Sequence, residues 1–170
     1  MLPLIQANTQ VLQQLIDLVN RVSQEVYAEG SSLSDYGVGR HVRHVVDHYL
    51  ALQQSVNHGR VDYNLRQRDS VIETQPAEAV LHIETLVEWL STLTNLSQPV
   101  VMVTEISTEE TNIADMTSSL ERELCYLINH TVHHLAYAAL LAKAQGIVLD
   151  HSLGLAPSTA SYIRQQAVQA

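Results

Sequence analysis

Apolar residues recur at helical spacing in four stretches of the chain, and proline or glycine stands at several of their ends. The stretches cover residues 3–29, 37–58, 76–96 and 118–146. The first alone would be about 40 Å long at 1.5 Å per residue. Long amphipathic helices of this kind predict an all-α protein built as a helical bundle.

Capping signals mark two of these helices. Ser118 and Glu121 form a Ser-x-x-Glu capping box, which predicts that the fourth helix starts at Ser118. Gly59 and Gly146 end the second and fourth helices, and glycine is suited to the left-handed conformation that ends such helices. The connection before the second helix offers Ser34 or Asp35 as its N-cap.

Two further elements complete the expected fold. Residues 99–107 are rich in β-branched side chains, and residues 111–117 can pair with them across a short turn, which predicts a small β-hairpin. Pro157 marks the start of a short C-terminal amphipathic helix. No internal repeat or linker divides the chain, so we expect residues 1–170 to form one domain.

The composition narrows the class of protein. A formal charge of -9 argues against a nucleic-acid surface, which needs a basic patch. No apolar run approaches the ~20 residues that span a bilayer, and the N-terminus lacks the pattern of a signal peptide. The single cysteine, Cys125, falls in a predicted buried helix, where we expect an inert thiol. We therefore expect a soluble, cytoplasmic protein without a nucleic-acid or membrane partner.

Histidines are concentrated in the fourth predicted helix, at His130, His133 and His134. His130 and His134 lie one turn apart within the apolar stripe, a spacing that lets two imidazoles converge on one cation. Burying two imidazoles side by side costs free energy unless each finds a partner. A divalent metal ion is one such partner, and hydrogen bonds within the core are the alternative.

A second histidine cluster, His41, His44 and His48, lies on one flank of the second predicted helix. Helical periodicity favours His41 or His48 as the inward-facing residue, with His44 slightly farther round. Two packed helices that present histidines to one point form a metal site, as helical bundles do. We therefore predict a metal site in preference to structural histidines.

The spacing excludes several known kinds of site. In residues 130–134, His-Thr-Val-His-His, threonine stands where a zincin has its glutamate base. A ferritin-like di-iron site needs two Glu-x-x-His pairs, and the sequence contains none. Three neutral histidines from two helices would leave coordination positions open, and the metal would then acidify a water or a thiol. That chemistry suits hydrolysis or activation of a thiol nucleophile.

The polar connection over residues 60–75 combines Tyr63, Arg66, Arg68 and Asp69. One interpretation is a loop that covers the site and offers arginines to an anionic substrate group. We favour the simpler interpretation, a strap that ion pairs hold against the bundle.

Four segments carry a family resemblance: GRHVRHVVDHYL, GRVDYNLRQRD, ERELCYLINHTVHHLAYAALLAKAQGI and LGLAPSTAS. They resemble the DinB/YfiT-like superfamily of metal-binding proteins, over most of the chain. The resemblance implies an up-down-down-up four-helix bundle that is commonly a homodimer. It also implies a divalent metal ion, often nickel, zinc or iron, held by one histidine of the second helix and a His-x-x-x-His pair of the fourth.

Carried over to this sequence, the resemblance assigns the pair to His130 and His134 and the third ligand to His44. His48 is the substitute for His44. His41 and His133 would then lie beside the ligands or in the core. The resemblance thus selects His44, whereas periodicity favours one of its neighbours.

Characterised relatives in the superfamily include S-transferases and isomerases that use low-molecular-weight thiols, and many members have no assigned activity. A shared fold does not fix a function. Our leading hypothesis is a metal-dependent enzyme, an S-transferase or hydrolase acting on a small molecule. Tyr49 and Tyr137 are candidates to orient the substrate, although we expect both to fill the core. Trp89 is expected in the core or at a dimer contact.

Two other classes of protein stay open at this point. A non-catalytic metal- or ligand-binding bundle, such as a sensor in which His41 and His48 respond to pH, would have a closed four-ligand site without an adjoining cavity. A purely structural dimeric bundle would bind no metal.

Overall fold

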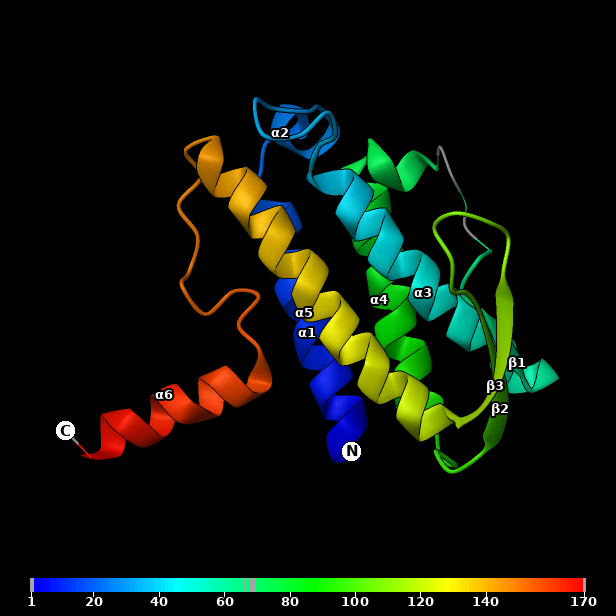
Figure 1. Cartoon of the computed structure of the whole chain (residues 1–170). Coiled ribbons are helices and arrows are strands. Elements are labelled where there is room, and N and C mark those ends of the chain that lie inside the picture. Colours follow the sequence, from blue (N-terminus) through cyan, green and yellow to red (C-terminus); the bar gives the residue numbers. More distant parts are fainter. Residues whose placement is uncertain (1, 66, 68–69, 170) are drawn as a thin grey trace.

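The computed structural model describes residues 2–65, 67 and 70–169 of the chain (Figure 1). Over these residues the fold is mostly helical, with six α-helices, one 3-10 helix and a small three-stranded sheet. The elements in chain order are α1 (Pro3–Arg21), α2 (Gln24–Ala28), α3 (Val38–His58), β1 (Arg60–Asp62), η1 (Val71–Glu73), α4 (Pro76–Thr92), β2 (Pro99–Glu105), β3 (Ile113–Ser119), α5 (Leu120–Ala144) and α6 (Pro157–Gln169).

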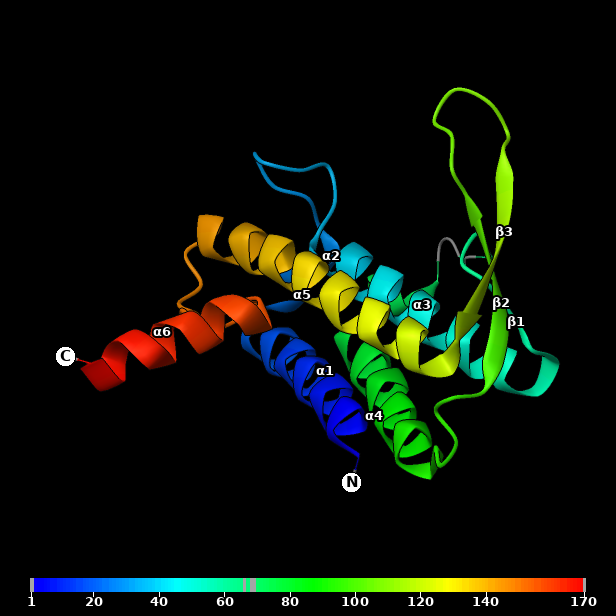
Figure 2. The same cartoon turned by 60° about the horizontal axis from the view of Figure 1, so that its bottom comes forward.

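The four long helices α1, α3, α4 and α5 pack side by side. Helix α1 contacts α4 and α5, and α3 contacts the same two helices from the other side. Figures 1 and 2 show that α1 and α5 run in one direction and that α3 and α4 run in the opposite direction. The apolar face of each helix turns inward, as its periodicity predicts. The fully buried side chains include Leu12, Leu15, Leu52, Leu86, Leu90, Leu124 and Leu135.

The glycine signals at two helix ends are confirmed, but the predicted N-caps are wrong. Gly59 and Gly146 take left-handed φ angles of 68° and 83° after α3 and α5. The cap of α5 is Ser119, whose side chain accepts a hydrogen bond from the backbone N–H of Arg122. Ser118 belongs instead to the last position but one of β3. Helix α3 follows Gly37 without a side-chain cap.

The first helix is shorter than its periodicity predicts. Helix α1 ends at Arg21, and Val22 and Ser23 are extended. The Ser23 hydroxyl then accepts a hydrogen bond from the N–H of Val26 and starts the short helix α2. A local serine cap therefore competes with continuation of the helix. The helix predicted over residues 76–96 also ends early. It corresponds to α4, which ends at Thr92, and Leu93 after it is extended with ψ at 125°.

The predicted hairpin is confirmed and carries an additional strand. Strands β2 and β3 pair antiparallel, with Pro99 opposite Ser119. Strand β1 pairs with β2 in parallel, with Arg60 opposite Val101. A strand of three residues leaves almost no periodic signal, and its partner lies about forty residues away in the sequence, so local patterns do not predict it.

Helix α6 starts at Pro157, as predicted, and extends away from the long helices (Figures 1 and 2). Its side chains Tyr162, Ile163 and Val168 are exposed. Across the described part of the chain, no helix has both the length and the apolar character needed to cross a bilayer.

Candidate metal centre

The packing of α3 against α5 brings one histidine of α3 together with two of α5. One ring nitrogen of His44, one of His130 and one of His134 all lie within 4.8 Å of one another. All three side chains are half-buried. The i,i+4 spacing along α5 stacks His130 and His134 on one side of that helix, which fixes two members of the group before α3 packs.

The three imidazole rings form a triangle. The ring centroids are 5.0 Å apart for His44 and His130, 4.5 Å for His44 and His134, and 4.6 Å for His130 and His134. Two metal–nitrogen bonds of about 2.1 Å span at most about 4.2 Å, so small side-chain rotations suffice for one ion to bridge the group. The donor set, three imidazoles without a carboxylate, fits a divalent transition metal.

His41 lies directly behind this group. Its Nδ1 atom is 3.2 Å from the Nδ1 atom of His134, a hydrogen-bonding distance that requires one proton between them. Burial lowers the pKa of His41, and the nearby Arg40 and His133 lower it further, so the ring is neutral. With its Nδ1 turned to His41, His134 would hold a metal through Nε2.

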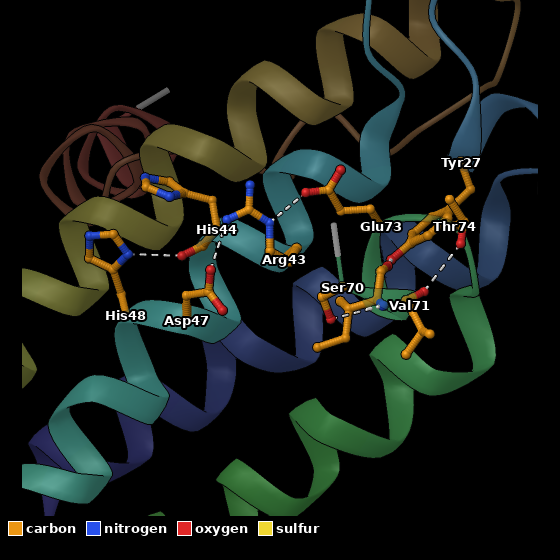
Figure 3. A network of polar contacts seen from close by, with 10 residues as sticks. Tyr27, Arg43, His44, Asp47, His48, Ser70, Val71, Glu73 and Thr74 are labelled. Atoms are coloured by element: carbon orange, nitrogen blue, oxygen red, sulfur yellow. Dashed lines mark hydrogen bonds and ion pairs between the residues drawn. The ribbon is translucent and has the colours of Figure 1, made fainter. Parts of the chain in front are cut away.

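His48 lies beside the group and is almost fully buried. Its Nδ1 donates a hydrogen bond of 2.9 Å to the backbone carbonyl of His44, which can only accept (Figure 3). Its ring stacks on that of His130, with centroids 4.0 Å apart. Periodicity is therefore right that His48 faces inward, yet His44 is the α3 histidine whose nitrogen joins those of α5.

Sequence reasoning missed a buried carboxylate that accepts a hydrogen bond from the tyrosine stacked on His48. Glu123 is fully buried, and its Oε2 accepts a hydrogen bond of 2.7 Å from the hydroxyl of Tyr63. Burial and the charge of Glu123 raise the pKa of Tyr63 well above its ordinary value, so Tyr63 stays a neutral donor. The ring of Tyr63 stacks on His48, at 5.1 Å and 17°.

The sequence does contain a signal for this arrangement. Glu123 precedes His130 by seven residues, and seven residues return a helix to nearly the same side. Tyr126 lies between these two residues in the sequence, and its ring is 5.4 Å from that of His130 and 5.3 Å from that of Tyr63. A glutamate in the first turn of a helix is usually solvated, which is why the spacing passes unnoticed.

The two tyrosines predicted near the ligands have different surroundings. Tyr49 is fully buried, and its hydroxyl donates a 2.8 Å hydrogen bond to the side chain of Asn8, so it fills the core as expected. Tyr137 does not fill the core: its side chain is 43% exposed, and its ring lies 4.7 Å from that of His41. Tyr137 therefore lies at the solvent edge of the histidine cluster.

The prediction of a buried thiol is wrong. Cys125 is exposed, although its neighbour Leu124 is fully buried. The apolar stripe of α5 runs through Leu124, Leu127 and Leu135, and one residue turns a helix by about 100°. That rotation carries Cys125 out of the stripe on the side away from His130.

An ion-pair network holds the described part of the connection after α3 against that helix (Figure 3). The buried guanidinium of Arg43 donates to Glu73 of η1 at 2.7 Å and to Asp47 at 2.8 Å. Tyr27 adds a 2.6 Å hydrogen bond to the carbonyl of Ile72. This part of the connection is thus a strap.

The ion pairs of the strap involve Arg43, Asp47 and Glu73, none of which sequence reasoning singled out for this role. Arg66, Arg68 and Asp69 lie outside the described residues. Arg60, at the start of the same connection, pairs with Asp115 of the hairpin at 3.0 Å. The ion pair between Arg43 and Glu73 lies next to His44, so the strap braces α3 at the level of the histidines.

Comparison with known proteins gives two findings. The chain is similar to a protein of Rhizopus delemar named FK506-binding protein 5, with 28% identity over 109 residues. The match covers 62% of this chain and 28% of that protein, so the chain corresponds to less than a third of its length. A model of the DinB family matches residues 1–168. On this match over nearly its whole length, the chain belongs to the DinB family.

Proposed function

We propose that this protein binds one divalent metal ion through His44, His130 and His134 and is a metal-dependent enzyme, a thiol S-transferase or a hydrolase acting on a small molecule. The observation that carries the proposal is the convergence of three imidazole nitrogens, from two helices, within 4.8 Å of one another. Nickel, zinc and iron are the metals we propose, because all three accept imidazole ligands.

Three protein ligands suit a catalytic site better than a structural one. Structural zinc sites use four protein ligands, whereas catalytic sites use three and leave a position for water or substrate. A divalent cation held by three neutral imidazoles acts as a Lewis acid and lowers the pKa of a water or thiol. Around it, His41 would hold the ring of His134 through the 3.2 Å contact, and His48 would hold that of His130 by stacking.

A hollow along α3 has room for a small molecule, although none of the three histidines lines it. Its volume is about 380 Å³, and Asp47, Gln54 and His58 of α3 line it together with Asp62 of β1. Pockets of about 300–1,000 Å³ hold small-molecule ligands. Asp47, at one end of the hollow, stands three residues after His44 on α3, so a molecule that reached this end would lie about one helical turn from the site.

The family assignment and the helix directions support finer features of the proposal. We propose that residues 1–170 form one DinB-like domain, an up-down-down-up four-helix bundle. We further propose that it functions in the cytoplasm as a homodimer, with a low-molecular-weight thiol as co-substrate if it is a transferase.

Elemental analysis of the purified, untagged protein tests the metal site. We expect about one divalent metal ion per chain and its loss in both His44→Ala and His130→Ala. His151→Ala, which removes an exposed histidine distant in sequence, is the control and should keep the metal. Absence of metal from the wild type after incubation with nickel, zinc and iron would refute the proposal.

Activity screens separate the enzyme from its alternative, a non-catalytic metal-binding protein. Metal-loaded protein is assayed for transfer of a low-molecular-weight thiol and for hydrolysis of small esters and amides. Turnover that disappears in His130→Ala supports the enzyme. Metal binding without turnover in any of these assays supports the non-catalytic binder.

A further inference from the structure

A second hollow lies at the far end of the helices from the strap. It has a volume of about 480 Å³ and is formed by the last turns of α3 and α4 and by the connection from α4 to β2. We infer that this hollow, which we call the Trp89 pocket, binds a neutral, polyhydroxylated ring such as a pyranose sugar.

One wall of the Trp89 pocket is apolar. Trp89 lines it together with Val56 and Leu93, and all three side chains are half-buried. An indole presents a broad, rigid apolar surface. Such a wall accommodates the C–H face of a sugar ring, which is the apolar side of an otherwise polar molecule.

The rest of the lining is polar and uncharged. Gln53 and Asn57 contribute amides from α3, Asn95 and Gln98 contribute amides from the connection, and Thr92 contributes a hydroxyl. All the residues that line this pocket are described by the structure, and none of them carries a charge. Amides and hydroxyls both donate and accept hydrogen bonds, as do the hydroxyl groups of a sugar.

Two of these polar groups are already oriented by the protein. Gln98 donates its Nε2 hydrogen to the carbonyl of Val56 at 2.8 Å, so its Oε1 is kept as an acceptor. Thr92 donates its hydroxyl hydrogen to the carbonyl of Trp89 at 2.7 Å, so its oxygen lone pairs are kept for another donor. Preorganised groups of this kind lower the entropy cost of binding.

The absence of charge in the lining selects among ligands. A charged ligand would lose hydration on entering the pocket and find no opposite charge there. A flat nucleobase places its hydrogen-bonding groups along its edges in one plane, whereas the amides here come from two separate segments, α3 and the connection from α4 to β2. A ring that bears hydroxyl groups around its circumference matches this distribution.

The Trp89 pocket is separate from the histidine cluster. Gln53 lies nine residues after His44 on α3, which corresponds to roughly 14 Å along the helix axis. Binding in the pocket therefore requires no metal, and the inference does not depend on the proposed enzymatic function.

Trp89 is the single tryptophan of the chain, so its fluorescence reports on this pocket alone. The metal-free protein is titrated with methyl glucoside, with glucuronate as the charged ring of similar shape, and with adenosine as the nucleoside. We expect a saturable change in emission with methyl glucoside and at least a several-fold weaker response to the other two.

Two adjacent glutamines provide a matched pair of variants. Gln53 lines the Trp89 pocket, whereas Gln54 lines the other hollow on α3. We expect Gln53→Ala to weaken the response to methyl glucoside roughly three- to tenfold, the effect of one lost hydrogen bond, and Gln54→Ala to leave it unchanged. An equal effect of both variants would overturn the inference.

Two other outcomes would also overturn it. One is no saturable response to methyl glucoside, or an equal response to glucuronate or adenosine. The other is emission that changes with protein concentration but not with sugar, because the pocket would then be a contact surface between copies of the chain.

Discussion

The Nδ1 atoms of His41 and His134 lie 3.2 Å apart, so a single proton joins the two rings. If Nε2 of His134 held a metal, that proton would stay on its Nδ1 and His41 would accept it. Partners of this kind fix the tautomer and orientation of a metal ligand. For the proposed metal site, this contact makes His41, rather than the exposed His133, the neighbour that we expect to affect metal affinity.

Replacing His41 by alanine should weaken metal binding about 10- to 100-fold without unfolding the protein, because the ring of His134 loses its hydrogen-bond partner. The dissociation constant is measured by competition with a chelator, and circular dichroism checks the fold. His133→Ala is the matched control, since the rings of His133 and His134 have their centroids 5.1 Å apart and His133 is exposed. Equal affinities for wild type and His41→Ala would contradict the assignment.

His44 and His48 should respond differently to substitution. We expect His44→Ala to lose the metal and His48→Ala to keep about one ion per chain with reduced affinity, because among the described residues it is His44 of α3 whose nitrogen groups with those of both His130 and His134. Isothermal titration with nickel or zinc gives both stoichiometries. Loss of the ion in His48→Ala and its retention in His44→Ala would reverse the ligand assignment.

High pH should destabilise the protein through Tyr63. Its pKa is raised above the ordinary value of 10.0, so the folded state keeps a proton that the unfolded state releases. A raised pKa contributes stability in full below pH 10, and that contribution is lost as the pH rises above it. Thermal unfolding of Tyr63→Phe should therefore show a shallower loss of Tm above about pH 10 than wild type.

At neutral pH, Tyr63→Phe should lower the stability of the protein. Tyr63→Phe loses the hydrogen bond to the buried carboxylate of Glu123, which should cost about 1.5–3 kcal/mol of unfolding free energy. Tyr36→Phe, at an exposed tyrosine, is the control for both measurements. Parallel pH profiles for wild type and Tyr63→Phe would show that Tyr63 does not govern the alkaline transition.

Arg43 should be the most sensitive position of the strap network. Arg43→Met leaves the almost fully buried carboxylate of Asp47 without its guanidinium, a change that costs about 3–5 kcal/mol. Glu73→Gln removes a partner that is 24% exposed and should cost about 1 kcal/mol. Urea unfolding measures both. A larger loss in Glu73→Gln than in Arg43→Met would refute this ranking.

The helices follow from the sequence because their signals are local. The apolar spacing of each long helix and the glycines at positions 59 and 146 need no knowledge of tertiary structure. The break at Ser23 and the early end at Leu93 escape the same reasoning, because the apolar pattern continues across both. Strand β1 escapes it because its pairing with β2 is non-local.

In the candidate site, too, local features could be predicted from the sequence and tertiary contacts could not. The pairing of His130 with His134 follows from their spacing on one helix. The choice among His41, His44 and His48 depends on how far α3 is rotated against α5, which periodicity resolves only to about one residue. The spacing of seven residues places Glu123 on the same side of α5 as His130, but its buried contact with Tyr63 joins residues sixty apart, so only the tertiary structure shows that contact.

The two histidines contributed by α5 also limit which length changes the gene can accept. A single residue inserted between Ser119 and His130 would rotate the rest of α5 by about 100° and shift it by about 1.5 Å. Both imidazoles would swing away from α3, while the inserted residue could itself be helical. A residue inserted in the exposed turn between β2 and β3 would rotate nothing. Related sequences with intact sites should therefore vary in length at that turn and keep the spacing from Ser119 to His134 unchanged.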